Sequence, residues 1–151
     1  MSVEVLNETE AELDSTEFVA LARYVLGRFN VHPQADLSIT MVDTTTMGML
    51  HERWMGDPAP TDVMAFPMDE VRPGEPGNES EGILGDVVLC PQVAATNARR
   101  AGHSPIEEML LLTVHGILHL LGFDHAEKEE ELVMFTLQRE LLLTFLATKA
   151  P

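Results

Sequence analysis

HGILHLLGFDH, residues 115–125, carries three histidines at the end of the clearest helix that the sequence predicts. Ser104 is a suitable N-cap, Pro105 fits the first helical position, and Glu107 supplies the acid of a capping box. The residues that follow are almost all apolar, and Gly122 ends the pattern. The sequence therefore predicts a buried helix that begins at Ser104 and presents histidines at its C-terminal end.

The spacing of these histidines indicates a metal site. His115 and His119 are one helical turn apart, so they share a face, with Cβ atoms about 6 Å apart. Two imidazoles at that spacing can direct nitrogens to one point ~2.0–2.1 Å away, which is the Zn–N bond length. Gly122 can adopt a positive φ and turn His125 back toward the pair. Three neutral imidazoles leave a fourth coordination position open, as in catalytic zinc sites, so we expect one Zn²⁺ per chain.

The alternative is a helix that merely contains histidines, but three buried imidazoles without a partner would be costly. Zincin proteases place a glutamate directly after the first histidine, where it polarises water. This chain has Gly116 there, which disfavours peptide hydrolysis by that route. Asp124 is the nearest carboxylate. It either orients a ligand or assists water, or it caps the last helix.

The rest of the pattern predicts an α+β fold in a single domain over residues 1–151, with helices packed on a small mixed sheet of about four strands. Pro67 cannot donate a ladder hydrogen bond, which predicts an edge or bulged strand over 61–69. The loop at 71–82 is long enough to be mobile or to line a site. The other predicted strands are 3–8, 36–43 and a central 83–90, and the other predicted helices are 17–29 (capped by Ser15 or Thr16), one from Asp43-Thr44 to Gly56, 91–102 and 127–148.

Apolar positions predict which side chains are buried. On the last helix the pattern places Leu132, Phe135, Leu142 and Phe145 inward. Five methionines fit as core residues rather than soft-metal ligands: Met41, Met47, Met49, Met64 and Met109. The histidines outside the cluster, His32, His51 and His103, are expected at the surface.

Composition limits the classes of function. The net charge is −16, from nine Lys and Arg against 25 Asp and Glu, which argues against a broad basic surface for nucleic acid. The one cysteine, Cys90, allows no internal disulfide, and a reducing cytoplasm is the expected location. No apolar run reaches the roughly 18 residues of a membrane span. The acidic N-terminal residues do not resemble a secretory signal, so no membrane association is expected.

Three stretches resemble the YbeY family, the bacterial metal-dependent endoribonucleases of ribosomal RNA maturation. They are residues 115–125, Pro60-Thr61-Asp62-Val63-Met64-Ala65-Phe66-Pro67, and Leu84-Gly85-Asp86-Val87, and the similarity spans about residues 3–145. The resemblance implies a zincin-like fold and a zinc ion held by His115, His119 and His125. It also implies single-stranded RNA (an rRNA precursor) as substrate, not DNA. The implied role is 16S rRNA 3′ maturation and ribosome quality control, with the small ribosomal subunit or its proteins as partners.

One position departs from this family. Members commonly have an arginine just before the glycine that precedes the PT(D/N)V motif, and here that residue is Met55. Arg53 is two residues earlier, a rotation of about 200° on a helix. It either replaces the family arginine or is a solvated cation. The hypothesis is metal-assisted phosphodiester hydrolysis, with Asp124 and Arg53 as candidate catalytic residues. Arg72, Arg99 and Arg100 are further candidate phosphate ligands.

Two other functions remain open at this level. One is a zincin-like metallopeptidase or amidohydrolase that uses Asp124 or an external base. The other is a non-catalytic ribosome-assembly factor in which zinc is structural.

Overall fold

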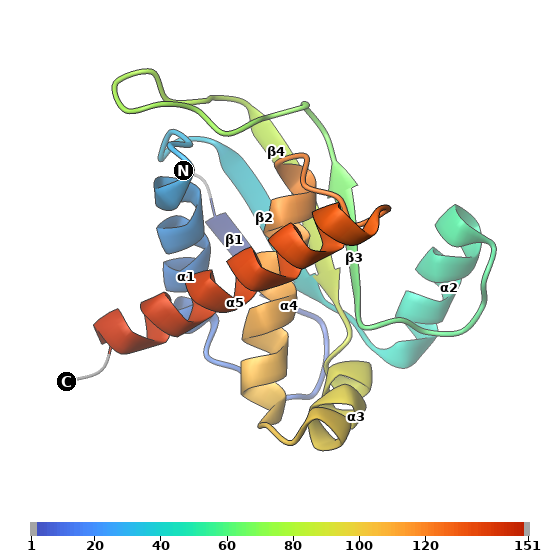
Figure 1. The fold of residues 1–151 in the computed structure, drawn as a ribbon. Helices are drawn as coiled ribbons and strands as arrows, with labels where there is room; N and C mark the ends of the chain where they lie inside the picture. The colour runs from blue at the N-terminus through green and yellow to red at the C-terminus, as the bar shows by residue number, and fades with distance from the viewer. Residues whose placement is uncertain (1–2, 150–151) are drawn as a thin grey trace.

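The computed structural model describes residues 3–149 and has the predicted α+β architecture (Figure 1). Its sheet has the order β1-β2-β4-β3, in which β1, β2 and β4 are parallel and β3 is antiparallel to β4. The sequence correctly predicts β4 as an interior strand and β3, which ends at Pro67, as an edge strand. The strands are β1 (Val3–Asn7), β2 (Asp36–Met41), β3 (Val63–Pro67) and β4 (Ile83–Leu89).

The fold is organised around helix α4, which packs on β3 and β4 and also contacts α1, α3 and α5. In Figure 1, α5 crosses over α4 on the side away from the sheet, and α2 stands apart beyond β3. No helix in residues 3–149 has the length and apolarity that a membrane crossing requires. The helices are α1 (Ser15–Arg28), α2 (Thr44–Met55), α3 (Pro91–Ala101), α4 (Pro105–Leu120) and α5 (Lys128–Lys149).

The predicted start of α4 is confirmed in detail. The Ser104 hydroxyl accepts a hydrogen bond from the Glu107 backbone N–H, and the Glu107 carboxylate accepts one from the Ser104 backbone N–H. Gly116 explains how closely this helix approaches the sheet. A Cβ at this position would lie 2.7 Å from Val87 Cγ1 on β4, so the contact has no room for a side chain.

Several local predictions are wrong. Asp14, not Ser15 or Thr16, is the N-cap of α1, and its carboxylate accepts from the Thr16 backbone N–H. On α5, Leu132 and Phe135 are 69% and 40% exposed, because the inward stripe runs through Met134, Gln138 and Leu141 instead. The buried residues of α5 are Met134, Gln138, Leu141, Leu142 and Phe145.

The burial of the five methionines follows how well the strand or helix that carries each one is packed. Met41, Met47 and Met109 are buried and Met64 is partly buried, as predicted. Met49 is 66% exposed, so its prediction as a core residue is wrong. Only Met47 and Gly48 are buried on α2, because this helix does not pack broadly on the sheet.

The long loop between β3 and β4 is held against the turn after α1. The His32 backbone N–H donates to the Ser80 carbonyl (2.7 Å), and the Ser80 N–H donates to the Asn30 carbonyl (3.0 Å). The Gly74 N–H donates to the Phe29 carbonyl (2.9 Å). These bonds fix the loop so that Arg72 lies near the end of α4.

Candidate functional site

Three histidine side chains converge at the C-terminal end of α4. One ligand nitrogen from each of His115, His119 and His125 lies within 4.8 Å of the others. The Nε2 atoms of His115 and His119 are 3.1 Å apart. The ring centroid of His125 lies 5.6 Å from the ring centroid of His115 and 5.1 Å from that of His119. The predicted convergence of the three rings is present, and a single divalent ion fits between such a set of nitrogens.

The return of His125 depends on Gly122, which has a φ of +98°. A Cβ on Gly122 would also lie 2.6 Å from Arg72 Nε. The turn is closed by hydrogen bonds from the Gly122 N–H to the His119 carbonyl and from the Phe123 N–H to the Leu118 carbonyl. The positive φ therefore favours glycine here, and a side chain would also displace the end of Arg72.

Gln138 on α5 holds the first histidine. Its Oε1 lies 2.8 Å from His115 Nδ1, and the Gln138 residue is only 8% exposed. Since the amide oxygen can only accept, this contact requires a proton on Nδ1 and leaves Nε2 free to face the other histidines. Second-sphere hydrogen bonds of this kind orient metal-binding imidazoles in known sites.

The environment favours neutral imidazoles. Burial lowers the pKa of His115, and the Gln138 hydrogen bond opposes this only in part. Burial also lowers the pKa of His119, and the nearby rings of His115 and His125 lower it further. Phe135 lies against two of the rings, with centroids 6.1 Å from His115 and 6.0 Å from His125. A neutral imidazole is the form that binds a metal ion.

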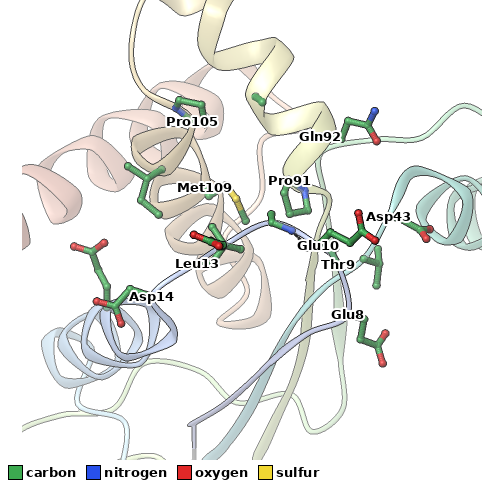
Figure 2. A pocket seen from close by; sticks show the side chains of 16 residues that line it. Glu8, Thr9, Glu10, Leu13, Asp14, Asp43, Pro91, Gln92, Pro105 and Met109 are labelled. Atoms are coloured by element: carbon green, nitrogen blue, oxygen red, sulfur yellow. Dashed lines mark hydrogen bonds between the residues drawn. The ribbon is translucent and has the colours of Figure 1, made fainter.

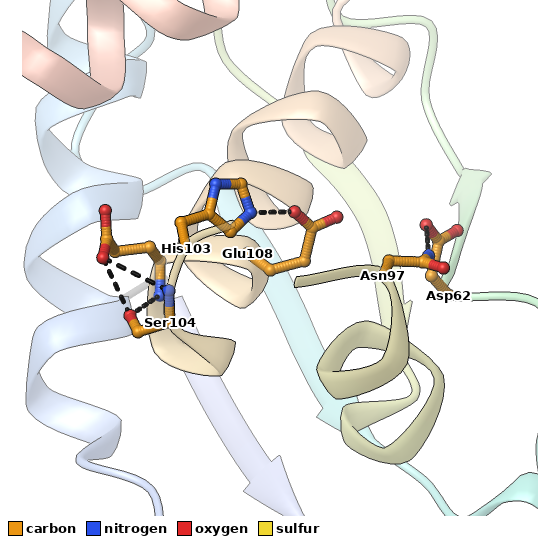
Figure 3. A network of polar contacts seen from close by, with 6 residues as sticks. Asp62, Asn97, His103, Ser104 and Glu108 are labelled. Carbon is orange, nitrogen blue, oxygen red and sulfur yellow. Dashed lines mark hydrogen bonds and ion pairs between the residues drawn. The ribbon is translucent and has the colours of Figure 1, made fainter. Parts of the chain in front are cut away.

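The histidines open into a cavity of about 790 Å³ between the end of α4, strand β3 and the end of α2. Asp62, immediately before β3, is a second carboxylate on its wall, and Asn97 on α3 donates to Asp62 Oδ2 (3.0 Å, Figure 3). Asp62 also favours the protonated form of His115. The cavity is lined by His51, Trp54, Met55, Thr61, Asp62, Val63, Met64, Ala65, Phe66, Pro67, His115, Gly116, His119, Gly122, Phe123, Asp124 and His125.

Asp124 lines this cavity, and its Oδ1 accepts a hydrogen bond from the His125 backbone N–H (2.7 Å). The interpretation of Asp124 as the cap of the last helix is wrong, because α5 begins four residues later at Lys128. Its carboxylate instead braces the backbone of a candidate ligand.

The arginines that the sequence suggests as phosphate ligands lie in different places relative to the cavity. Among the described residues, the lining of the cavity includes Met55 but not Arg53, whose guanidinium carbon lies 5.6 Å from the centre of the Trp54 ring. Arg72 lies behind the Gly122 turn. Arg99 and Arg100 are exposed at the end of α3, and neither lines the cavity.

The histidines outside the cluster are at the surface, as predicted, but each is partly buried and has a polar partner. His51 lies in the cavity, and its Nδ1 is 2.6 Å from the Ala59 carbonyl. His103 is partly buried, with Nε2 2.5 Å from a Glu108 carboxylate oxygen (Figure 3). His32 is partly buried as well, and its Nδ1 accepts from the Gln34 N–H.

Sequence reasoning missed Gln138, Asp62 and Phe135. A signal for Gln138 exists, because a polar residue interrupts the apolar stripe that runs from Met134 to Leu141 on α5. Asp62 lies within the PTDV motif but carries no spacing that relates it to the histidines. The position of Asp62 beside the histidines depends on how the chain folds.

A second, larger cavity lies at the opposite end of α4. It measures about 1030 Å³ and is bordered by the loop after β1, the start of α3 and the start of α4 (Figure 2). Its polar lining is mainly carboxylate, including Glu10, Asp14 and Asp43, and its floor is apolar, with Met109 and Pro91. No histidine is among its described lining residues. The convergent imidazoles therefore make the smaller cavity the candidate site.

Comparison with known proteins agrees with this geometry. The family model described as Endoribonuclease YbeY matches residues 4–146. The chain belongs to the YbeY family. A YbeY-family relative from Beutenbergia cavernae, named Endoribonuclease YbeY, is 66% identical over 97% of this chain and 99% of its own length. A relative of the same name from Bifidobacterium animalis subsp. lactis is 58% identical over 97% of this chain and 81% of its own length.

The likeness extends to a solved structure. The solution structure of TM1509 from Thermotoga maritima matches with a TM-score of 0.65 and 23% sequence identity, over 97% of this chain and 90% of that one. At this identity the match supports the fold alone. The zincin-like α+β fold that the YbeY resemblance implied is confirmed.

Proposed function

We propose that this YbeY-family protein is a zinc-dependent endoribonuclease that cleaves single-stranded RNA. Two observations support the proposal: relatives that match nearly the whole chain are named endoribonucleases, and three imidazole nitrogens converge within 4.8 Å on the wall of an open cavity. The convergence of His115, His119 and His125 carries it, because it supplies a place for catalysis at the cavity surface.

The donor set fits zinc. Three imidazoles, with no thiolate or fourth protein ligand grouped with them among residues 3–149, match the ligand type and number of catalytic zinc sites. His115, His119 and His125 would hold the ion. Zinc bound there would supply a Lewis acid that activates water and withdraws charge from a phosphate oxygen.

The protein's own groups have separate tasks in this proposal. Gln138 fixes His115 with Nε2 toward the cavity, and Asp124 braces the His125 backbone. Asp62 and Asp124 are the carboxylates on the cavity wall that can accept a proton from attacking water. Arg53 remains the candidate cation nearest to the position of the family arginine.

We also propose the finer role implied by the family resemblance. The substrate is then the precursor of 16S rRNA near its 3′ end, and the small ribosomal subunit or its proteins position it, in the cytoplasm. The strongly acidic chain supports a need for such positioning, because a net charge of −16 cannot by itself attract RNA.

The metallopeptidase alternative is disfavoured by packing. A zincin glutamate would occupy position 116, where an added Cβ would lie only 2.7 Å from Val87 Cγ1. The structural-zinc alternative is disfavoured by the open cavity beside the histidines, since structural zinc sites are closed by four protein ligands.

The test combines metal analysis with RNA cleavage. Purified protein is assayed on an RNA that contains one hairpin and one single-stranded tail, and on casein, before and after chelation and with zinc restored. We expect cleavage of the tail only, loss on chelation with retained circular dichroism, and recovery with zinc. Casein cleavage would support the peptidase instead. Unfolding on chelation, with no RNA cleavage by the zinc-loaded protein, would support the structural-zinc assembly factor.

A further inference from the structure

Trp54 and Met55 form an exposed apolar rim on the cavity that contains the histidines. Their exposed fractions are 59% and 69%, and both line the cavity. They lie in the last turn of α2, directly before the helix ends at Gly56 in a left-handed conformation. Contiguous exposed apolar groups at the edge of a cavity are typical of binding surfaces.

Two neighbouring side chains lie close to the indole of Trp54, which is still 59% exposed. Phe66 on β3 lies with its ring centroid 5.7 Å from that of Trp54, at an interplanar angle of 60°. The Arg53 guanidinium carbon lies 5.6 Å from the Trp54 ring centroid. The rim therefore combines a positioned aromatic surface with a cation, which are the two groups that bind a base and its phosphate.

We propose that Trp54 is a stacking platform for one base of the single-stranded RNA that enters the histidine cavity, with Arg53 contacting an adjacent phosphate. The inference rests on the proposed function and adds a binding subsite to it. Stacking suits this chain because it needs little charge, and the chain has only nine Lys and Arg residues against 25 acids. Bases in a duplex are already stacked on one another, so this platform also favours single strands.

The experiment uses the fact that Trp54 is the only tryptophan of the chain. Intrinsic fluorescence of the zinc-loaded protein is titrated with nonaadenylate RNA and with an abasic strand of equal length. We expect nonaadenylate to quench the emission and the abasic strand to leave it unchanged. With one phosphate contact on a single strand, affinity should fall only about threefold between 50 and 200 mM salt.

Variants separate stacking from general apolar contact. With a fluorescein-labelled nonaadenylate, Trp54→Ala should weaken binding about tenfold, as expected for loss of one stacked base. Trp54→Phe keeps an aromatic face and should recover most of the affinity. Leu143→Ala, at a residue 60% exposed on α5, is the matched control and should bind like the wild type. Arg53→Ala should retain the quenching but reduce the dependence on salt.

Three results would overturn the proposal. One is equal quenching by the abasic strand, and another is unchanged affinity in Trp54→Ala. The third is a dimer that dissociates in Trp54→Ala, which would assign the rim to a second copy of the chain. Quenching in His119→Ala tests the subsite separately from cleavage. If it persists there while no zinc-dependent cleavage is found for the wild type, the proposed function fails and the base-binding subsite stands.

Discussion

The two ends of α4 border two cavities with different linings. At the C-terminal end, a cavity of about 790 Å³ is lined by four histidines, three of which converge, together with two carboxylates and an edge strand. At the N-terminal end, about 1030 Å³ is lined by acidic side chains over an apolar floor. Some of those acids already have structural tasks. Asp14 and Asp43 cap α1 and α2, and Glu17 is paired with Lys149.

Convergence of ligand groups, rather than cavity volume, identifies the candidate site. In the smaller cavity three groups are directed by a neighbour: His115 by Gln138, His125 by Asp124 through its backbone, and Asp62 by Asn97. In the larger cavity the capping carboxylates are directed at helix N–H groups. Only the first arrangement leaves several directed groups facing one point in the cavity.

Removing one ligand should have the largest effect. We expect His119→Ala to lose bound zinc and to reduce RNA cleavage by more than about 100-fold, because two imidazoles hold the ion poorly. Glu10→Gln, in the larger cavity, should retain both properties within about twofold. Metal content by mass spectrometry and initial cleavage rates check both variants. Equal losses in the two variants would remove the distinction between the cavities.

Removing the partner of a ligand should have the next largest effect. Gln138→Leu leaves the His115 Nδ1–H without its acceptor and should weaken zinc binding about 10- to 100-fold. Gln138→Glu keeps an oxygen acceptor and should preserve the affinity. Competition with a chromogenic chelator measures the metal affinity, and nitrogen-15 NMR of the metal-free protein reports the His115 tautomer. A wild-type tautomer and affinity in Gln138→Leu would show that Gln138 only fills space.

The contrast between local and long-range contacts explains how much the sequence could predict. The capped start of α4, the Gly122 turn and the convergence of three histidines all depend on residues close in the chain, and each was predicted correctly. Gln138 reaches His115 from 23 residues away, and Asp62 reaches the site from another element. Such positions depend on how α5 and β3 pack on α4. The periodicity of apolar residues within one segment carries no information about that packing.

The errors in the predicted burial of side chains have the same physical cause. Helices that pack broadly on the core, such as α4, bury the residues that their pattern predicts. On α2, Met49 is predicted as a core residue but is exposed, and Trp54 is exposed as well, because only Met47 and Gly48 are buried there. Phe135 has the apolarity of a core residue but packs beside two histidines instead.

The third prediction concerns Gly116, which lines the smaller cavity and packs closely against the Val87 side chain. Gly116→Ala places a methyl group 2.7 Å from Val87 Cγ1, and we expect a loss of about 1–3 kcal/mol in the free energy of unfolding. Gly27→Ala is the control, because a Cβ on this exposed glycine of α1 meets nothing within 4 Å. It should raise the free energy of unfolding by about 0.5–1 kcal/mol. Urea unfolding of both metal-free variants checks the opposite signs, and a neutral Gly116→Ala would contradict the close contact of α4 with β4.

The histidines at the C-terminal end of α4 should also make the free energy of unfolding depend on pH. The folded-state pKa values of His115 and His119 lie below the ordinary value of 6.5, so the unfolded chain binds more protons in weak acid. The free energy of unfolding of the metal-free protein should therefore be highest above pH 6.5 and decrease as the pH falls below it. Urea unfolding between pH 7.5 and 5.5 measures this decrease. His119→Gln should show a shallower decrease, and an identical slope would contradict the depressed pKa.

The smallest expected effect concerns the rim of the histidine cavity, where Met55 occupies the position of the family arginine. Met55 lines the cavity and Arg53 does not, so Met55→Arg adds a cation that can reach a phosphate in the cavity. We expect a two- to fivefold gain in cleavage rate, about the contribution of one exposed charge contact of 0.4–1 kcal/mol. Met55→Gln, similar in length and uncharged, should leave the rate unchanged. If instead Arg53→Ala alone abolishes cleavage and Met55→Arg restores it, Arg53 already performs the family arginine's task from another face of the same turn. A gain from Met55→Arg that persists in 0.5 M salt would indicate a buried contact rather than an exposed one, because salt screens exposed charges over a few ångströms.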